Sequence, residues 1–227
     1  MARSKSSKAW LRRHVGDPYV HKAKARGYRS RAIFKLIEIS ERDRLLHPGA
    51  VVIDLGAAPG GWSQSLVEQV GPRGRVVAVD LLEMAPISGA TLIRGDFRDE
   101  AVRLRVRNIL GGSLADLVVS DMAPNLSGVS ATDQARSIHL CELALEFAAA
   151  HLKPGGAFLV KVFQGAGYED YLAAMRRTFV RVVSRKPEAS RSSSSEIYLL
   201  GKKIRNRSQE SGSGPGKGRG FSRVLNP

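Results

Sequence analysis

The chain has 227 residues, of which 43% are hydrophobic and 6% aromatic, a composition that fits one soluble globular domain with a full core. No apolar run reaches the roughly 20 residues that a membrane helix needs, and the first residues lack the hydrophobic core of a signal peptide. A single cysteine, Cys141, excludes a disulfide framework, and the five histidines show no metal-ligand spacing. We therefore expect a cytoplasmic protein with neither a membrane span nor a metal site.

Positive charge gathers at the two ends of the chain. The formal net charge is +15, and residues 1–31 hold ten Lys or Arg against Asp17 alone. Residues 201–227 hold seven against Glu210, so the stretch between these two ends is neutral overall. No amphipathic lipid-binding helix is evident, and two basic ends on a neutral body therefore favour nucleic acid over a membrane as the partner.

From about residue 49 the chain alternates between strand-like and helix-like segments. One helix follows the first strand and ends at Gly71, and another runs over 133–152 and stops at a Lys-Pro-Gly-Gly terminator. This alternation predicts an α/β fold with a doubly wound parallel sheet. Two later strands lie too close together for a helical crossover, and they should pair antiparallel. The predicted strands cover 50–56, 74–81, 90–97, 115–124, 155–163, 179–186 and 195–203.

A loop of small residues, DLGAAPGGW at 54–62, joins the first strand to the next helix, where this kind of fold binds nucleotides or nucleosides. Compared with the dinucleotide fingerprint G-x-G-x-x-G, the loop has Ala58 in place of a glycine, and Pro59 removes an amide donor. A pyrophosphate is therefore disfavoured, and no P-loop motif is present in the sequence. A tight turn that only packs the helix on the strand is the simpler interpretation.

Three aspartates, Asp80, Asp96 and Asp121, are predicted to end three successive parallel strands. Each alone could cap a helix or lie in a solvated turn. Together they should line one crevice, because the carboxyl ends of parallel strands meet at one edge of the sheet. A ligand with a ribose, an exocyclic amine and a positive charge suits them, and S-adenosylmethionine has all three.

Lys161 interrupts the apolar strand GGAFLVKVFQG at 155–165. Lysine is almost never fully buried unless it is paired, so the simplest interpretation is a strand end whose ammonium group reaches water.

Seven segments in order resemble the FtsJ/RrmJ-type (RlmE) ribosomal RNA 2′-O-methyltransferases over nearly all of residues 20–203. The resemblance implies a class I S-adenosylmethionine-dependent methyltransferase fold, with a seven-stranded, mostly parallel sheet and an antiparallel last strand. It also implies 2′-O-methylation of a ribose in RNA, most closely a uridine of large-subunit (23S) ribosomal RNA late in ribosome assembly. The segments are YRSRAIFKLIEI, DLGAAPGGWSQ, VVAVDLL, GDFRD, LVVSDMAPNLSG, GAFLVKVFQG and SSSSEIYLLGK.

The resemblance further implies the site residues. A Lys-Asp-Lys-Glu catalytic tetrad falls at Lys35, Asp121, Lys161 and Glu196, and cofactor contacts fall at Gly60, Trp62, Asp80, Asp96 and Asp121. The predicted topology agrees, because an antiparallel last strand brings its start to the edge where the parallel strands end. Lys35 belongs to a predicted helix outside the sheet, whose residues Ile33, Leu36 and Ile37 should face the core.

Two roles for Lys161 stay open at this point. A neutral lysine would take the proton of the 2′-hydroxyl, whereas a cationic lysine would stabilise the developing alkoxide while the proton leaves by another route. The resemblance implies RNA, most closely the large ribosomal subunit or its RNA, as the partner. RNA phosphates and bases should be held by the basic stretch before Lys35, which contains Arg26, Arg29 and Arg31 with Tyr19 and Tyr28.

These inferences divide the chain into a basic RNA-binding arm at 1–31, a methyltransferase domain at 32–205 and a disordered Gly/Ser/Arg-rich tail at 206–227. We expect a monomer. Three other functions remain open: a transfer RNA methyltransferase of the same family, a non-catalytic RNA-binding module on this fold, and a small-molecule or amine methyltransferase.

Overall fold

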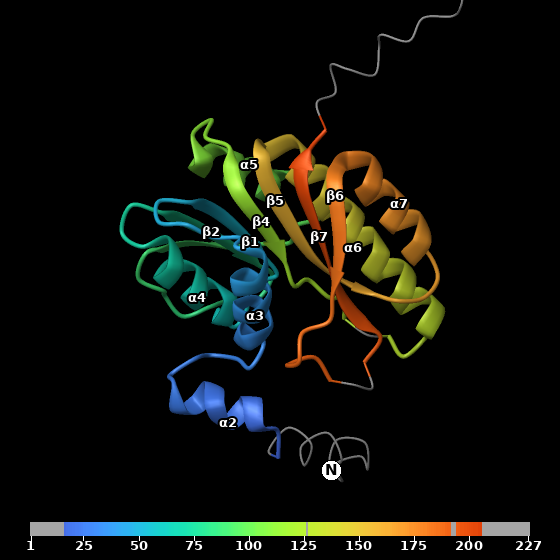
Figure 1. Ribbon diagram of the computed structural model, residues 1–227, viewed down its shortest axis with the longest axis horizontal. Helices are drawn as coiled ribbons and strands as arrows, with labels where there is room; N and C mark the ends of the chain where they lie inside the picture. Colours follow the sequence, from blue (N-terminus) through green and yellow to red (C-terminus); the bar gives the residue numbers. More distant parts are fainter. Residues whose placement is uncertain (1–15, 126, 192–193, 206–227) are drawn as a thin grey trace, which may run out of the picture.

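The computed structural model describes residues 16–125, 127–191 and 194–205 (Figure 1). The first half of the predicted arm and the predicted disordered tail lie outside the described residues. Among the helices in these ranges, none has both the length and the apolar character that a bilayer span requires.

A seven-stranded sheet forms the centre of the molecule, with the strand order β3-β2-β1-β4-β5-β7-β6. Neighbouring strands from β3 to β5 pair in parallel, whereas β7 is antiparallel to both β5 and β6. The predicted doubly wound sheet with one antiparallel last strand is therefore confirmed. The strands are β1 Val51–Leu55, β2 Arg75–Asp80, β3 Ala90–Arg94, β4 Ala115–Ser120, β5 Leu152–Phe163, β6 Phe179–Arg185 and β7 Glu196–Ile204.

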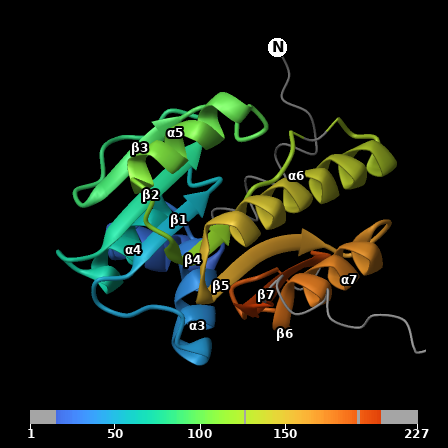
Figure 2. The same ribbon diagram turned by 90° about the horizontal axis from the view of Figure 1, so that it is seen from above.

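Helices cover both faces of the sheet, and Figure 2 shows α5 and α6 on one side with α3 and α4 on the other. The two faces bury separate hydrophobic clusters, one with α5, α6 and α7 and the other with α3 and α4. The short helix α2 precedes α3 and packs through Ala23 against Phe34 of α3. The helices are α2 Pro18–Ala25, α3 Ile33–Asp43, α4 Gly61–Val70, α5 Glu100–Leu110, α6 Ser130–His151 and α7 Tyr168–Thr178.

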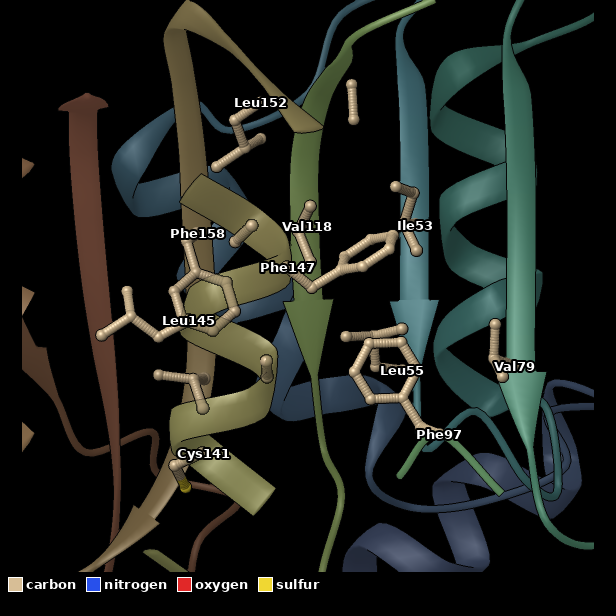
Figure 3. Close-up of a cluster of buried hydrophobic side chains, with 14 of the residues drawn as sticks. Ile53, Leu55, Val79, Phe97, Val118, Cys141, Leu145, Phe147, Leu152 and Phe158 are labelled. Carbon is tan, nitrogen blue, oxygen red and sulfur yellow. The ribbon is translucent and has the colours of Figure 1, made fainter. Parts of the chain in front are cut away.

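The larger cluster lies between α6 and the middle strands. In Figure 3, Leu145 and Phe147 of α6 face the strand residues Phe158, Val118 and Ile53, all of which are buried. Because strand side chains alternate between faces, strands buried on both sides read as continuous apolar runs. Each such side chain contributes roughly 1.5–3 kcal/mol by leaving water, and the middle of the sheet is therefore a rigid support for its edges.

Several boundaries differ from the predicted ones. Strand β3 ends at Arg94 and β4 at Ser120, so Asp96 and Asp121 stand in the loops that follow these strands. The Lys-Pro-Gly-Gly stretch does not separate α6 from β5, because β5 already starts at Leu152. Leu152 pairs with Ala115 and Ala157 with Leu117, so the Pro-Gly stretch forms an irregularity within the strand pairing.

Candidate active site

The tetrad predicted from the resemblance gathers at the carboxyl edge of the sheet, where β1, β2 and β4 end. Asp121 directly follows β4, Lys161 lies near the end of β5, and Glu196 is the first residue of β7. In the antiparallel pairing of β5 with β7, Glu196 lies opposite Phe163 and Tyr198 opposite Lys161. The start of β7 therefore reaches the same edge, as the predicted topology requires.

Lys161 is buried, and its ammonium group is paired with Asp121. Its Nζ donates to the Asp121 main-chain carbonyl at 2.6 Å and lies 3.1 Å from Oδ1 of the same residue, while the side chain is 8% exposed. The position near the strand end is as predicted, but the ammonium group does not reach water. Of the two partners expected for it, Asp121 and Glu196, Asp121 forms the ion pair, while Glu196 pairs with Lys35. Pairing with a carboxylate and a carbonyl is what makes the burial of this cation tolerable.

Lys35 forms the second ion pair of the cluster. Its Nζ lies 2.6 Å from Oε1 of Glu196, and the same carboxylate oxygen accepts a hydrogen bond from Ser190 Oγ at 2.8 Å. Burial alone would raise the pKa of Glu196, but the charge and hydrogen bond of Lys35 outweigh it, with help from Ser190 and the charge of Lys161. The pKa of Glu196 is therefore below its ordinary value, and the group is an anion near neutral pH.

Tyr198 connects the two ion pairs, although it was not among the predicted site residues. Its hydroxyl donates to Oδ1 of Asp121 at 3.0 Å, and the Lys35 ammonium lies 5.7 Å from the centre of its ring. Burial raises the pKa of Tyr198 well above its ordinary value, so the hydroxyl stays a donor. The signal was the period of two residues along β7, which places Tyr198 on the same face as Glu196.

A cavity of about 580 Å³ lies beside this cluster, and the three predicted aspartates line it together. Other lining residues come from the glycine loop, from the start of the loop after β2 and from α6. The prediction that Asp80, Asp96 and Asp121 share one crevice is confirmed. Their roles toward a ligand stay a prediction.

Asp80 ties the glycine loop to the loop after β2. Its Oδ2 accepts from the amide of Ala58 and its Oδ1 from the amide of Leu82, each at 2.8 Å. Gly56 has φ 77°, and a Cβ there would come 2.7 Å from the main-chain nitrogen of Met122. Only glycine therefore allows the loop to pass so close to the chain after β4.

Asp96 is held by Arg98, which also lines the cavity. The Arg98 side chain donates through Nε and Nη2 at 2.5 to 3.0 Å, and its amide donates to Oδ1. Hydrogen bonds from the Arg98 side chain lower the pKa of Asp96, so the carboxylate is ionised. Each carboxylate oxygen thus accepts two hydrogen bonds from Arg98, and a ligand would bind Asp96 by displacing part of this pairing.

Gly60 and Trp62 are not among the residues that line the cavity, and the cofactor contacts implied for them stay a prediction. The indole of Trp62 is buried, donates to the carbonyl of Ala32 at 2.8 Å and packs against Tyr198. Trp62 is the second residue of α4 and belongs to the hydrophobic cluster beneath α3. Its side chain therefore supports the site from within the core. Gly60 caps α4 with φ 107°.

Asp54 of β1 is a further buried acid close to the glycine loop. Its Oδ2 accepts from Ser63 Oγ at 2.7 Å, and Oδ1 has no hydrogen-bond partner among the described residues. Burial raises the pKa of Asp54 to about 7, although the hydrogen bond from Ser63 opposes the rise, and the charges of Asp121 and Asp80 add to it. The sequence offered only its position in the loop motif as a signal.

Most of the side chains predicted to bind RNA before Lys35 make contacts within the protein, and their contact with RNA stays a prediction. Arg31 bonds to the Asp17 carboxylate and to the carbonyl of Ala189, and Arg29 donates to loop carbonyls. The rings of both tyrosines, Tyr19 and Tyr28, pack on Phe34 at 5.6 and 6.0 Å. Internal contacts thus occupy these side chains, and only Arg26 of the predicted set is fully exposed.

Comparisons with known proteins agree with this geometry. A model of the FtsJ-like methyltransferase family matches residues 28–204. The ribosomal RNA large subunit methyltransferase E of Chromobacterium violaceum is 60% identical over 202 residues, covering 89% of this chain and 98% of that protein. The protein of the same name from Azoarcus sp. is 58% identical over 205 residues, covering 90% and 100%. A crystal structure of a Plasmodium falciparum protein assigned as a ribosomal RNA methyltransferase superposes with a TM-score of 0.68 at 27% identity, covering 78% and 98%. With a family model over most of its length and full-length relatives near 60% identity, this chain belongs to the FtsJ-like methyltransferase family.

Proposed function

We propose that this protein transfers a methyl group from S-adenosylmethionine to a ribose 2′-hydroxyl of large-subunit ribosomal RNA. The observation that carries the proposal concerns Asp121. This residue lines the cavity and also belongs to the buried cluster of two lysines and two acids, so the cavity and the cluster adjoin. Relatives named for the large ribosomal subunit favour that RNA over transfer RNA. We propose a uridine of 23S ribosomal RNA, in assembled or nearly assembled subunits, as the target.

The residues around the cavity fit the cofactor. A volume of about 580 Å³ is ample for a ligand of this size. Asp80 would accept from the ribose hydroxyls and Asp96 from the exocyclic amine, while the Asp121 carboxylate would face positive charge. When bound, S-adenosylmethionine supplies a methyl group on a positively charged sulfur.

Lys161 is the residue that we propose to act on the 2′-oxygen. An ammonium group has three N–H donors, and one of them donates to the Asp121 main-chain carbonyl, while Oδ1 of the same residue forms an ion pair with Nζ at 3.1 Å. The remaining donor capacity is available to the attacking oxygen. As a cation, Lys161 would stabilise the developing alkoxide, while the 2′-hydroxyl proton passes to solvent water.

Lys35 of α3 and Glu196 at the start of β7 are the other two members of the tetrad. The salt bridge between them holds both side chains at the edge of the site, and Ser190 keeps the Glu196 carboxylate in place. Their main contribution is to hold the ribose within attacking distance of the methyl group. In a direct transfer, this positioning accounts for most of the lowering of the activation barrier.

RNA would approach over α2, whose exposed face is basic. His21, Lys22, Lys24 and Arg26 are all exposed. Positive side chains at such a surface bind phosphates without sequence preference, and the tetrad then selects the ribose. We propose that residues 1–31 bind RNA, that 32–205 form the catalytic domain, that the basic 206–227 tail adds contacts, and that the protein acts as a cytoplasmic monomer.

A methyl-transfer assay with a matched lysine control tests the proposal. Purified protein is incubated with radiolabelled S-adenosylmethionine and unmethylated large subunits, and the product nucleotide is identified by mass spectrometry. Lys161→Ala should abolish transfer and keep cofactor binding. Lys153→Ala is the control, because Lys153 lies at the other end of β5 and binds Asp116 there. Wild-type transfer by Lys161→Ala, or a methyl group on a base, would contradict the proposal, and a wild-type protein that binds no cofactor would indicate a non-catalytic module.

A further inference from the structure

Arg29 reaches from the segment between α2 and α3 to two loops beside the cavity. Its Nη1 donates to the carbonyl of Ala85 at 2.7 Å and its Nη2 to the carbonyl of Pro86 at 2.7 Å. The same Nη1 lies 3.4 Å from the carbonyl of Pro59 in the glycine loop. One planar guanidinium group therefore joins the 81–89 loop to the 56–60 loop, as its fixed fork of donors allows.

The main chain of Arg29 is itself fixed to α4. Its amide donates to Oε1 of Gln64 at 2.9 Å, and Nε2 of the same glutamine donates to the carbonyl of Gly27 at 3.2 Å. This double contact sets the direction in which the side chain leaves the backbone. The guanidinium is thus positioned in advance and loses less conformational freedom on forming its bonds.

Gly60 provides the space that this arrangement needs. A Cβ at Gly60 would come 2.8 Å from Cδ1 of Ile87 and 3.0 Å from Nη1 of Arg29. Ile87 and Arg29 thus both lie against the glycine at the start of α4. A side chain at position 60 would therefore disturb the packing of Ile87 and Arg29.

The 81–89 loop depends on such contacts because it is mostly exposed, and its Glu83 makes only an exposed ion pair with Arg94 of β3. Seven of its nine residues are exposed, among them Leu81 and Leu82, which line the cavity. Asp80 holds the start of the loop through the amide of Leu82, and the end joins β3. Arg29 is the contact in the middle, at Ala85 and Pro86.

We propose that Arg29 is a positioning residue for the cofactor. It holds the 81–89 loop against the glycine loop, and so sets the wall of the cavity that Leu81 and Leu82 form. This role replaces the phosphate contact expected for Arg29 from the sequence. It rests on the proposed function in so far as the cavity takes S-adenosylmethionine.

Three variants test the proposal, with cofactor binding and methyl transfer measured separately. In Arg29→Ala we expect the Kd of S-adenosylhomocysteine, measured by calorimetry, and the KM of S-adenosylmethionine to rise about tenfold, which is the scale for losing charge-assisted hydrogen bonds. The kcat at saturating cofactor should stay within about twofold. Arg29→Lys, which can reach one carbonyl but not two, should recover part of the affinity. Arg73→Ala is the control, because Arg73 is exposed in the turn before β2, does not line the cavity and should leave the Kd unchanged.

A second measurement reports on the loop without any cofactor. Glu83 is 80% exposed, so cleavage by a glutamate-specific protease at this residue can be followed by mass spectrometry. Loss of the Arg29 contact should speed this cleavage severalfold in Arg29→Ala and less in Arg29→Lys. Thermal unfolding of each variant identifies one that fails to fold, in which case Arg29→Lys carries the test.

The outcomes separate this proposal from the proposed function. If wild-type protein bound no S-adenosylhomocysteine, the proposed function would fail, while the protease measurement would still decide whether Arg29 holds the loop. A wild-type Kd in folded Arg29→Ala would overturn the positioning role. So would a lower kcat at an unchanged KM for the cofactor, or weaker RNA binding with a wild-type Kd.

Discussion

Asp54 allows a quantitative test of how the base of the glycine loop is built. The carboxyl group is fully buried, accepts one hydrogen bond from Ser63, and has one oxygen without a partner among the described residues. The variant Asp54→Asn keeps the size of the side chain and the acceptor for Ser63, and it cannot ionise. Any stability difference that varies with pH between the two proteins therefore comes from the charge at this position.

The sign follows from the direction of the pKa change. Burial raises the pKa of Asp54 from 3.8 to about 7, so the folded protein binds this proton more tightly than the unfolded chain does. Its favourable contribution is complete below about pH 4 and is lost as the pH rises to about 7. The rise corresponds to about 4 kcal/mol, since each pKa unit is worth about 1.4 kcal/mol.

Urea unfolding of both proteins at pH 5, 6, 7 and 8 measures this effect. The unfolding free energy of Asp54→Asn minus that of the wild type should rise by about 1.4 kcal/mol per pH unit up to about pH 7 and then level off. Asp43→Asn is a matched control. Hydrogen bonds from Arg185 lower the pKa of Asp43, so it is ionised in both states above about pH 5 and its difference from wild type should be flat. A flat difference for Asp54→Asn as well would refute the reasoning.

Three further predictions concern the tetrad and the RNA surface. Tyr198→Phe keeps the ring but removes the hydrogen bond to Asp121. We expect kcat in the methyl-transfer assay to fall about tenfold, with KM for the cofactor unchanged. An unaltered kcat would show that the Tyr198 hydroxyl does not contribute to the reaction. Ser190→Ala removes one of two bonds to the Glu196 carboxylate, and a severalfold lower kcat is expected, smaller than the loss in Glu196→Ala. Neutralising the exposed basic side chains of α2 should reduce the slope of log K for RNA against log salt by about 2 to 3, whereas the same change on α7 should leave it alone, and equal slopes would place the RNA elsewhere. The α2 residues are Lys22, Lys24 and Arg26, and the α7 controls are Arg176 and Arg177.

The topology could be predicted because it follows from local sequence patterns. Continuous apolar runs mark strands that are buried on both faces, and the short connection before β7 allows only an antiparallel return. The same patterns placed Asp80, Asp96 and Asp121 at one edge of the sheet. Positions near strand ends are thus recoverable from sequence even where the ends themselves move by three or four residues, as those of β3 and β4 do.

Pairing within the site could not be predicted in this way. Lys35 and Glu196 lie 161 residues apart, and nothing local distinguishes this pair from a Lys35–Asp121 pair. Arg29 was expected at the RNA because its charge is visible in the sequence, whereas the main-chain carbonyls that bind it have no sequence signature. Charge patterns predict that a side chain needs a partner, and the tertiary structure decides which one it finds.

Stability does not explain why four charged groups meet at this edge of the sheet. Removing two ions from water costs several kcal/mol for each, and replacing a buried ion pair with apolar residues of similar volume is often neutral or stabilising. The Lys161–Asp121 pair is well satisfied, yet an apolar pair there would complete the core of β4 and β5 at least as well. What an apolar pair lacks is a donor for a developing alkoxide and a carboxylate beside a positively charged sulfur. The buried charges are therefore best explained by the chemistry proposed for the neighbouring cavity, in which the Lys161 ammonium group can donate to the reacting oxygen.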